Sequence, residues 1–309
     1  MLVLVAAEFV LRVVFPEPLF TYFYGPSDKV WDEDRELFWT PKDHYASQWT
    51  QIENLPADRL AYGLGGSIVM AHHVDEPFYM IAQKCLRGSP AIVNFGTHGF
   101  TTHQSLVMLK RALARKKPRL VLVSHGFNDL ANAPASDRAM AERNARAATR
   151  LLHFMSGSKI FESLRRAVRA ATGFDPYGKS DEFNVTRRVP IGAYGANLRA
   201  MVRLTADNGI PLVLISQANP DAAIVASLEP YFAVMERVAE AHKNVYYLDV
   251  RPEIIGRYTA EFGGLPPHLD DKISPYLYLP GDPCHLNADG HRVVGELLCK
   301  FLKEKGLAG

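Results

Sequence analysis

The sequence predicts an α/β fold in which helices cover both faces of an open, mostly parallel sheet, giving three layers in the order α/β/α. Short apolar runs of strand length alternate with segments of helical character from residue 60 to residue 304. The run Leu120–Val123 is wholly apolar, as expected of a strand that is buried on both faces. Glycine-rich or polar residues follow three of the runs, and sites in such sheets form at the carboxyl ends of the strands.

The elements follow one another at regular intervals along this region. We expect strands over residues 60–64, 91–95, 119–124, 211–216 and 245–248. We expect helices over about 69–87, 103–117, 193–208, 228–242 and 287–304, and a loop-rich stretch that ends at Gly281. In the second of these helices, Leu106, Leu109 and Leu113 fall on one face.

Residues 1–58 are expected to form an N-terminal arm, and residues 59–309 one domain. The arm is wholly apolar from Met1 to Ala7, but Glu8 and Arg12 interrupt the run that follows. A membrane-spanning helix needs about 20 apolar residues. We therefore expect the stub of a spanning helix that starts upstream, a peripheral amphipathic segment, or a docked helix.

The region from about 130 to 190 interrupts the alternation and is predicted as a helical insertion, with helices over about 139–154 and 159–171. Basic residues outnumber acidic residues between Arg143 and Arg188. The insertion is either a pair of solvated helices or a lid or surface for an anionic substrate or phospholipid headgroups.

Composition and motifs exclude several classes of protein. The formal net charge of the 309 residues is +2, which argues against a nucleic-acid partner. Cys85, Cys284 and Cys299 are too few for a disulfide framework or a zinc ribbon, and one of them must stay unpaired within the chain. Ile68 breaks the dinucleotide fingerprint and Val69 breaks the nucleophile elbow of α/β-hydrolases. We expect no cofactor.

Ser67 follows Gly65 and Gly66 at a predicted strand-to-helix turn. It is either an N-cap in a glycine-rich turn or a nucleophile, because the helix start favours negative charge beside its hydroxyl. A serine nucleophile needs a base, and the base needs an orienting partner. Asp282 and His285 lie three residues apart before the final helix, a spacing that lets Asp282 accept from Nδ1 while Nε2 points at Ser67.

Two more candidates follow the next two strands. Gly99 ends the segment after the second strand, and Asn128 lies just past the third. One sheet edge would therefore collect Ser67, Gly99 and Asn128. An oxyanion formed by attack of Ser67 would be held by the N–H groups of Ser67 and Gly99 and by the amide of Asn128.

From about Ala61 to Phe301 the sequence resembles the SGNH hydrolases, also called the GDSL esterase/lipase family. Four blocks carry the resemblance, in family order: Gly65-Gly66-Ser67, Asn94 to Gly99, Gly126 to Asp129, and Asp282 to His285. The family's name motif has aspartate where Gly66 stands, but that aspartate is not a triad member. The pattern from Glu8 to Val14 is also similar to the juxtamembrane end of bacterial members anchored by one helix.

The resemblance implies a flavodoxin-like SGNH hydrolase fold and a serine esterase that cleaves carboxylic esters through an acyl-enzyme. It implies Ser67 as nucleophile, His285 as general base and acid, Asp282 as its orienter, and Gly99 and Asn128 in the oxyanion hole. The substrate would be a small-molecule, glycan or lipid ester. The juxtamembrane pattern implies an extracytoplasmic location, periplasmic or membrane-associated, and leaves a cytoplasmic one open.

Other functions stay open. The same chemistry would serve an O-acyltransferase or O-acetylesterase acting on a cell-envelope or exported polysaccharide. The fold alone would serve a non-catalytic glycan-binding module or a nucleotide-binding domain, although no phosphate loop is visible.

Further histidines lie near the predicted strand ends. We expect His98 and His125 to line the pocket or to hydrogen-bond the catalytic groups. We expect His291, inside the final helix, to pack rather than to replace His285 as the base. A zinc site is the alternative, but no known ligand spacing is present among His72, His73, His98, His103 and His125. We expect no metal.

Overall fold

The computed structural model describes residues 8, 10, 31–34, 36–41, 44–86, 91–133, 135–146, 158, 160, 163, 164, 167, 171, 186–264, 276–280, 282 and 284–308. The chain divides into two compact units, one of residues 1–42 and 133–186 and the other of residues 43–132 and 187–309. The larger unit begins at residue 43 rather than at 59 as predicted, because helix α2 (His44–Asn54) belongs to it. The region predicted as an insertion, about 130–190, overlaps the second segment of the smaller unit, residues 133–186.

A five-stranded parallel sheet forms the centre of the larger unit. Its order is β4-β3-β5-β8-β9, and its strands are β3 (Leu60–Gly65), β4 (Ala91–Asn94), β5 (Leu120–Ser124), β8 (Leu212–Ile215) and β9 (Val245–Leu248). Every residue of β3, β5 and β8 is buried, as the apolar runs predict. This order is that of flavodoxin-like sheets, so the predicted α/β fold is confirmed.

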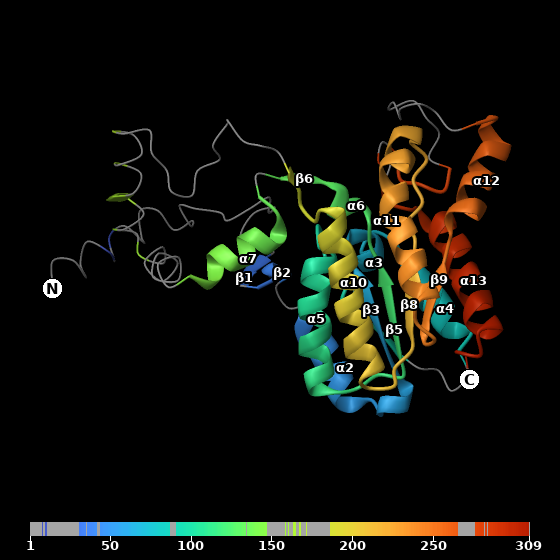
Figure 1. Cartoon of the computed structure of the whole chain (residues 1–309), viewed down its shortest axis with the longest axis horizontal. Coiled ribbons are helices and arrows are strands. Elements are labelled where there is room, and N and C mark those ends of the chain that lie inside the picture. Colours follow the sequence, from blue (N-terminus) through green and yellow to red (C-terminus); the bar gives the residue numbers. More distant parts are fainter. Residues whose placement is uncertain are drawn as a thin grey trace. The chain divides into compact units, whose positions relative to one another are not determined.

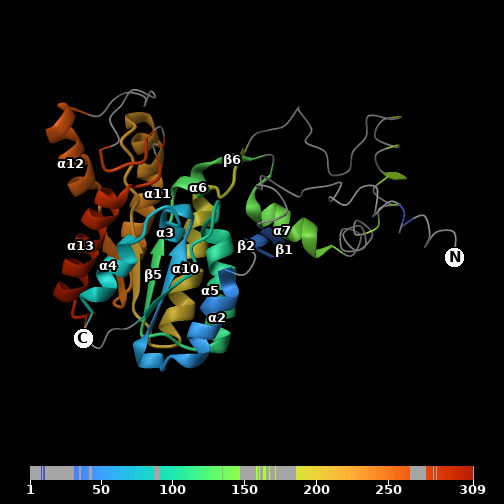
Figure 2. The same cartoon turned by 180° about the vertical axis from the view of Figure 1, so that it is seen from behind.

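Helices cover both faces of this sheet (Figures 1 and 2). On one face α13 packs against α4 and α12, and on the other α10 packs against α5 and α11. The bounds are α4 (Phe78–Lys84), α5 (Thr102–Arg115), α10 (Ile191–Ala206), α11 (Ala222–Glu240), α12 (Arg251–Phe262) and α13 (Ala288–Glu304). The sheet is therefore the middle layer of three.

The strand order places a switch point beside β3. From β3 the chain passes to β4 on one side, and from β4 it crosses back to β5 on the other side. Loops that leave neighbouring strands in opposite directions open a crevice at the carboxyl ends of those strands. Gly65 pairs with Ser124 in the register of β3 and β5, so the segments after these two strands begin at the same level.

The smaller elements of the larger unit include the 3₁₀ turn η1 (Ala57–Arg59) and two one-turn helices, α3 (Ser67–Met70) and α6 (Phe127–Leu130). Strands β6 (Asn132–Ala133) and β7 (Thr186–Arg187) form a two-stranded sheet where the chain passes from one unit to the other.

The smaller unit holds the antiparallel pair β1 (Trp31–Asp34) and β2 (Phe38–Pro41), and helix α7 (Asp137–Ala145). Its two chain segments are joined at Glu8, whose carboxylate accepts from Ser158 Oγ at 2.9 Å and from the backbone N–H of Ile160 at 3.0 Å. Helix α7 accounts for the first part of the helix predicted over 139–154. The rest of that helix and most of the helix predicted over 159–171 lie outside the described residues.

Two predictions about helices were wrong. The helix predicted over 69–87 is broken, because Ala71 adopts a left-handed conformation (φ 46°) that ends α3, and Pro77 caps the start of α4. The stretch predicted as loop-rich contains α12, which begins with a proline in its first turn and ends at Gly263 (φ 77°). Proline and glycine favour helix ends at these positions rather than opposing the helix.

Among the described residues, none of the helices has the length and apolar character needed to cross a membrane. The apolar run from Met1 to Ala7 lies outside those residues, so the predicted membrane connection stays a prediction.

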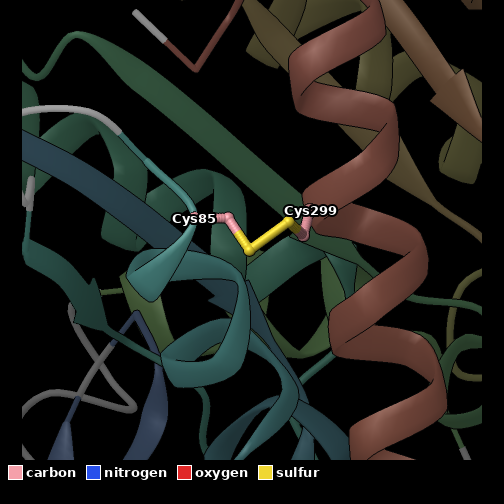
Figure 3. Close-up of a disulfide and its surroundings, with 2 residues drawn as sticks. All are labelled: Cys85 and Cys299. Carbon is pink, nitrogen blue, oxygen red and sulfur yellow. A yellow bond between two sulfur atoms is a disulfide. The ribbon is translucent and has the colours of Figure 1, made fainter.

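A disulfide joins two of the helices that pack on one face of the sheet. Cys85 caps the C-terminus of α4 and pairs with Cys299 of α13 (Figure 3). Cys284 is free. The bridge links residues 214 positions apart in the sequence. A cross-link that closes so long a loop stabilises the native state chiefly by restricting the unfolded chain.

Loss of this bridge should lower stability. Replacing both Cys85 and Cys299 with alanine should reduce the free energy of unfolding by about 2–4 kcal/mol, as measured by urea denaturation. Reducing agent should lower the urea midpoint of the wild-type protein in the same way and leave that of the double variant unchanged. Cys284→Ala serves as the matched control and should keep the sensitivity to reductant. A wild-type midpoint that ignores reductant would contradict this prediction.

Candidate active site

Ser67, His285 and Asp282 form a chain of hydrogen bonds. His285 Nε2 lies 2.7 Å from Ser67 Oγ, and His285 Nδ1 lies 2.5 Å from Asp282 Oδ2. An ionised carboxylate only accepts hydrogen bonds, so Nδ1 carries the proton and Nε2 of the neutral ring accepts from the serine hydroxyl. His285 is 23% exposed and Asp282 is 33% exposed, which leaves the site open to solvent and to a ligand.

The Asp282 carboxylate is held in its ionised form. Burial raises the pKa of this carboxyl, but hydrogen bonds from the backbone N–H of Cys284 and from the His285 ring and N–H outweigh burial and bring the pKa below its ordinary value. The two backbone bonds reach Asp282 Oδ1 at 2.8 Å and 3.1 Å. Oδ2 is thereby directed to the imidazole, which fixes the ring orientation.

The loop that carries these two residues is tied back on itself. The backbone N–H of Leu279 donates to His285 O at 2.9 Å, and that of Asn287 donates to Leu277 O at 3.0 Å. The side chain of Asn287 then caps α13 by accepting from Gly290 N. Leu277 has a positive φ of 65°, an unfavourable conformation for leucine that the surrounding bonds maintain.

Ser67 begins helix α3 directly after β3, as predicted, and close packing on both sides explains the two glycines before it. A Cβ at Gly65 would lie 2.3 Å from Val69 Cγ2 and 2.7 Å from Ser124 O. A Cβ at Gly66 would lie 2.4 Å from Asn128 Nδ2. Glycine in place of the family's aspartate therefore lets the Asn128 amide lie directly against the turn that carries Ser67.

The structure brings the other predicted oxyanion residues to the same edge. Gly99 adopts a positive φ of 69° in the turn after β4, and Asn128 lies in α6 after β5. One N–H of the Asn128 amide donates to Phe100 O at 3.0 Å, which joins the two segments. A primary amide has two N–H groups, so this bond leaves one for a ligand.

Loss of the Asn128 amide should affect turnover rather than binding. Asn128→Ala should lower kcat by about 10²- to 10³-fold with little change in KM, because the amide meets negative charge only in the transition state. The isosteric Asn128→Asp should be at least as severe, since it removes the donor. Asn132→Ala, four residues along in the same segment, should leave both constants unchanged. A raised KM with kcat preserved in Asn128→Ala would assign Asn128 to substrate binding instead.

His98 and His125 occupy different environments. His125 is 1% exposed, its Nε2 lies 2.7 Å from Ser105 Oγ, and burial together with the charge of Arg188 lowers its pKa to about 3. It is a core residue whose ring hydrogen-bonds to Ser105. His98 Nε2 lies 3.1 Å from His72 Nδ1. Burial first, and then the neighbouring histidines including His285, lower the pKa of His98 to about 4.

Two further histidines lie near the loop that carries His285. His73 Nε2 lies 2.8 Å from Leu286 O, and its ring centroid is 5.7 Å from that of His285. His291 is fully buried and stacks on Phe78, with ring planes 7° apart, and burial lowers its pKa to about 3. His291 therefore packs in the core, as predicted. No group of three or more His, Cys, Asp or Glu among the described residues is placed to hold a metal ion.

Sequence reasoning missed residues that hold the site together. The Asn94 amide donates to Val69 O at 3.1 Å, and its Oδ1 accepts from Gly96 N at 2.8 Å, so it ties the helix of Ser67 to the glycine segment. Gln217 Oε1 accepts from Phe127 N at 3.0 Å, beside Asn128. Asn94 ends a strand and Gln217 follows one, and this position is the signal by which the sequence could have indicated them. A third supporting residue, Arg188, has no such signal in the sequence.

Comparisons with known proteins identify a family and a shared fold. The profile of the GDSL-like Lipase/Acylhydrolase family matches residues 58–293. No curated protein matches the chain. Among solved structures, an acetyl xylan esterase has a TM-score of 0.51 at 13% identity, over 79% of this chain and 99% of that chain.

Two other solved structures are similar. A GDSL-like lipase from Bacteroides thetaiotaomicron has a TM-score of 0.49 at 14% identity, over 84% of this chain and 98% of that chain. An acetylxylan esterase from Geobacillus stearothermophilus, solved as a catalytic mutant, has a TM-score of 0.49 at 16% identity, over 82% and 96%. At 13% identity, the acetyl xylan esterase shows that the fold is shared. The family profile covers most of the chain, and the protein therefore belongs to the GDSL-like Lipase/Acylhydrolase family.

Proposed function

We propose that the protein is a serine esterase that hydrolyses carboxylic esters through an acyl-enzyme on Ser67. The observation that carries this proposal is the continuous chain of hydrogen bonds from Ser67 through His285 to Asp282. Family membership as a hydrolase supports it. A non-catalytic module would have no need of a nucleophile, a base and an ionised orienting carboxylate joined by these hydrogen bonds.

The proposed reaction uses the hydrogen-bonded groups in turn. As Ser67 Oγ attacks the ester carbonyl, His285 Nε2 takes the hydroxyl proton, and Asp282 stabilises the imidazolium that forms. The carbonyl oxygen becomes an oxyanion, which the N–H groups of Ser67 and Gly99 and the free N–H of the Asn128 amide stabilise. His285 then gives the proton to the leaving alcohol. Water, activated by the same histidine, releases the acid and restores Ser67.

The test is a panel of p-nitrophenyl esters from acetate to palmitate, with acetylated xylan and a lysophospholipid alongside. We expect turnover of at least one ester, and inactivation by an organophosphonate that modifies one residue per chain, mapped to Ser67 by peptide mass. Adding a sugar alcohol distinguishes hydrolysis from acyl transfer, because a transferase forms the sugar ester in place of the free acid. Absence of both turnover and labelling would contradict the proposal.

We also propose an extracytoplasmic location. The disulfide between Cys85 and Cys299 supports it, because structural disulfides persist in oxidising compartments and are rare in the cytosol. Peptide mapping without reduction, on protein alkylated inside intact cells, should recover the two cysteines linked. Alkylation of both thiols would contradict this location.

A further inference from the structure

Arg188 contacts both segments that build the predicted oxyanion hole. It lies at the start of the short connection that leads the chain from β7 to α10. Its backbone N–H donates to Ala131 O at 2.8 Å, and the next N–H, of Val189, donates to Asp129 O at 3.1 Å. These bonds attach it to the segment that follows Asn128. Its guanidinium donates from Nη1 to Gly99 O at 2.5 Å.

We propose that Arg188 is a positioning residue for the oxyanion hole. It holds Gly99 in the orientation that directs the Gly99 N–H at the developing negative charge. This inference rests on the proposed function. Glycine at a positive φ is conformationally permissive, and a local constraint on the peptide group after Gly99 is the bond from the Phe100 N–H to Thr97 O at 3.1 Å. An arginine bonded to the carbonyl supplies a charge-assisted constraint, which is stronger than one between neutral groups.

The required precision explains why this bond matters. An oxyanion donor acts only when it lies about 2.7–3.1 Å from the position that the oxyanion will occupy. The segment around Gly99 is also tied to the site by the bond from Asn128 to Phe100 O and by the bond from the Thr97 N–H to Gly65 O. Arg188 and Asn128 thus hold two successive carbonyls of this segment. The guanidinium also places a positive charge at the carbonyl of the residue whose N–H is the predicted donor, which favours the anionic transition state.

The neighbouring Arg187 provides a matched control. Its guanidinium donates to Leu130 O at 2.7 Å and to Asn132 Oδ1 at 3.0 Å, and the side chain is exposed. It therefore strengthens the same connection at the surface without contacting the glycine segment. A general effect of losing an arginine from this connection should appear in both positions, whereas an effect on the oxyanion hole should appear only at Arg188.

The experiment compares Arg188→Met, Arg188→Lys and Arg187→Met by kcat and KM on an ester that the wild type hydrolyses. We expect Arg188→Met to lower kcat by about 10- to 100-fold with KM nearly unchanged, because only the transition state is affected. Arg188→Lys should recover part of the loss, and Arg187→Met should match the wild type. The affinity of an alkyl boronic acid, whose adduct with Ser67 mimics the oxyanion, should fall in Arg188→Met by about the same factor as kcat/KM.

A second measurement covers variants that fold poorly. In Arg188→Ala, added guanidinium ion should raise kcat in a saturable way, whereas it should not do so in Arg187→Ala. A raised KM with kcat preserved, equal effects at the two arginines, or unchanged boronic acid affinity would overturn the inference. Ser67→Ala measured in parallel separates the two proposals: activity that survives it would overturn the esterase mechanism itself, whereas loss of activity there with normal Arg188 variants would overturn only the positioning role.

Discussion

Replacing Ser67 with alanine should lower kcat on a short-chain p-nitrophenyl ester by about 10³-fold or more, without loss of the fold. The substitution removes the Oγ atom that bonds His285 Nε2 and adds no atom to a tightly packed turn. The residual rate would come from the oxyanion donors and substrate binding alone. Stopped-flow or steady-state assays measure the loss, and urea denaturation checks the fold.

A matched serine provides the control for this substitution. Ser227 is exposed on α11, where its hydroxyl donates to Ala223 O at 2.9 Å, and Ser227→Ala should keep full activity. The organophosphonate should modify the wild type and Ser227→Ala and leave Ser67→Ala unmodified. Unchanged turnover in Ser67→Ala would remove Ser67 from the mechanism, whatever the labelling result.

The strands could be predicted because burial on both faces leaves a simple pattern. Leu120–Val123 and Leu212–Ile215 are continuous apolar runs, and the structure buries every residue in them. The candidate catalytic residues could be located because each follows a strand or precedes a helix at a family block. In a parallel sheet the carboxyl ends of the strands meet at one edge, so residues that follow different strands in the sequence are expected to lie close together in space.

The bounds of the helices were less predictable, because they depend on single residues. Ala71 ends α3 by adopting a left-handed conformation that alanine rarely takes and that no local pattern announces. In α12, Ile254 and Tyr258 form a buried helical face four residues apart, but the nearby proline and glycines suggested a loop. Packing against the rest of the fold decided between helix and loop, and this packing cannot be read from the local sequence.

The supporting contacts were the hardest part of the site to foresee. Arg188 lies 89 positions from Gly99 in the sequence. Nothing in the sequence indicated that Arg188 would contact the glycine segment while its neighbour Arg187 would not. His98 and His125 both follow strands, yet one pairs with another histidine near His285 and the other is buried beneath α5. Sequence position fixes the edge of the sheet but not the direction in which a side chain points.

Replacing Asp282 with asparagine should lower kcat by about 10⁴-fold, because an amide in place of the carboxylate favours the wrong imidazole tautomer. The pKa of Asp282 lies below its ordinary value, since the bonds from Cys284 and His285 outweigh burial. Its contribution to stability and catalysis should therefore be present above about pH 4 and be lost only as the pH falls through its lowered pKa. Asp289→Asn, which changes an exposed carboxylate at the start of α13, should leave kcat unchanged.

The same series separates this mechanism from metal-dependent hydrolysis. With Asp282 and His285 as the working pair, EDTA should leave kcat/KM unchanged, and His98→Ala should cost far less than Asp282→Asn. The low pKa of His98, about 4, keeps its ring neutral in the assay, so its removal takes no charge from the site. His125 variants should lower the free energy of unfolding rather than kcat, because the ring is buried and bonded to Ser105. Activity abolished by EDTA and restored by zinc, with His98 as indispensable as His285, would make Ser67 a bystander and assign hydrolysis to a metal-bound water.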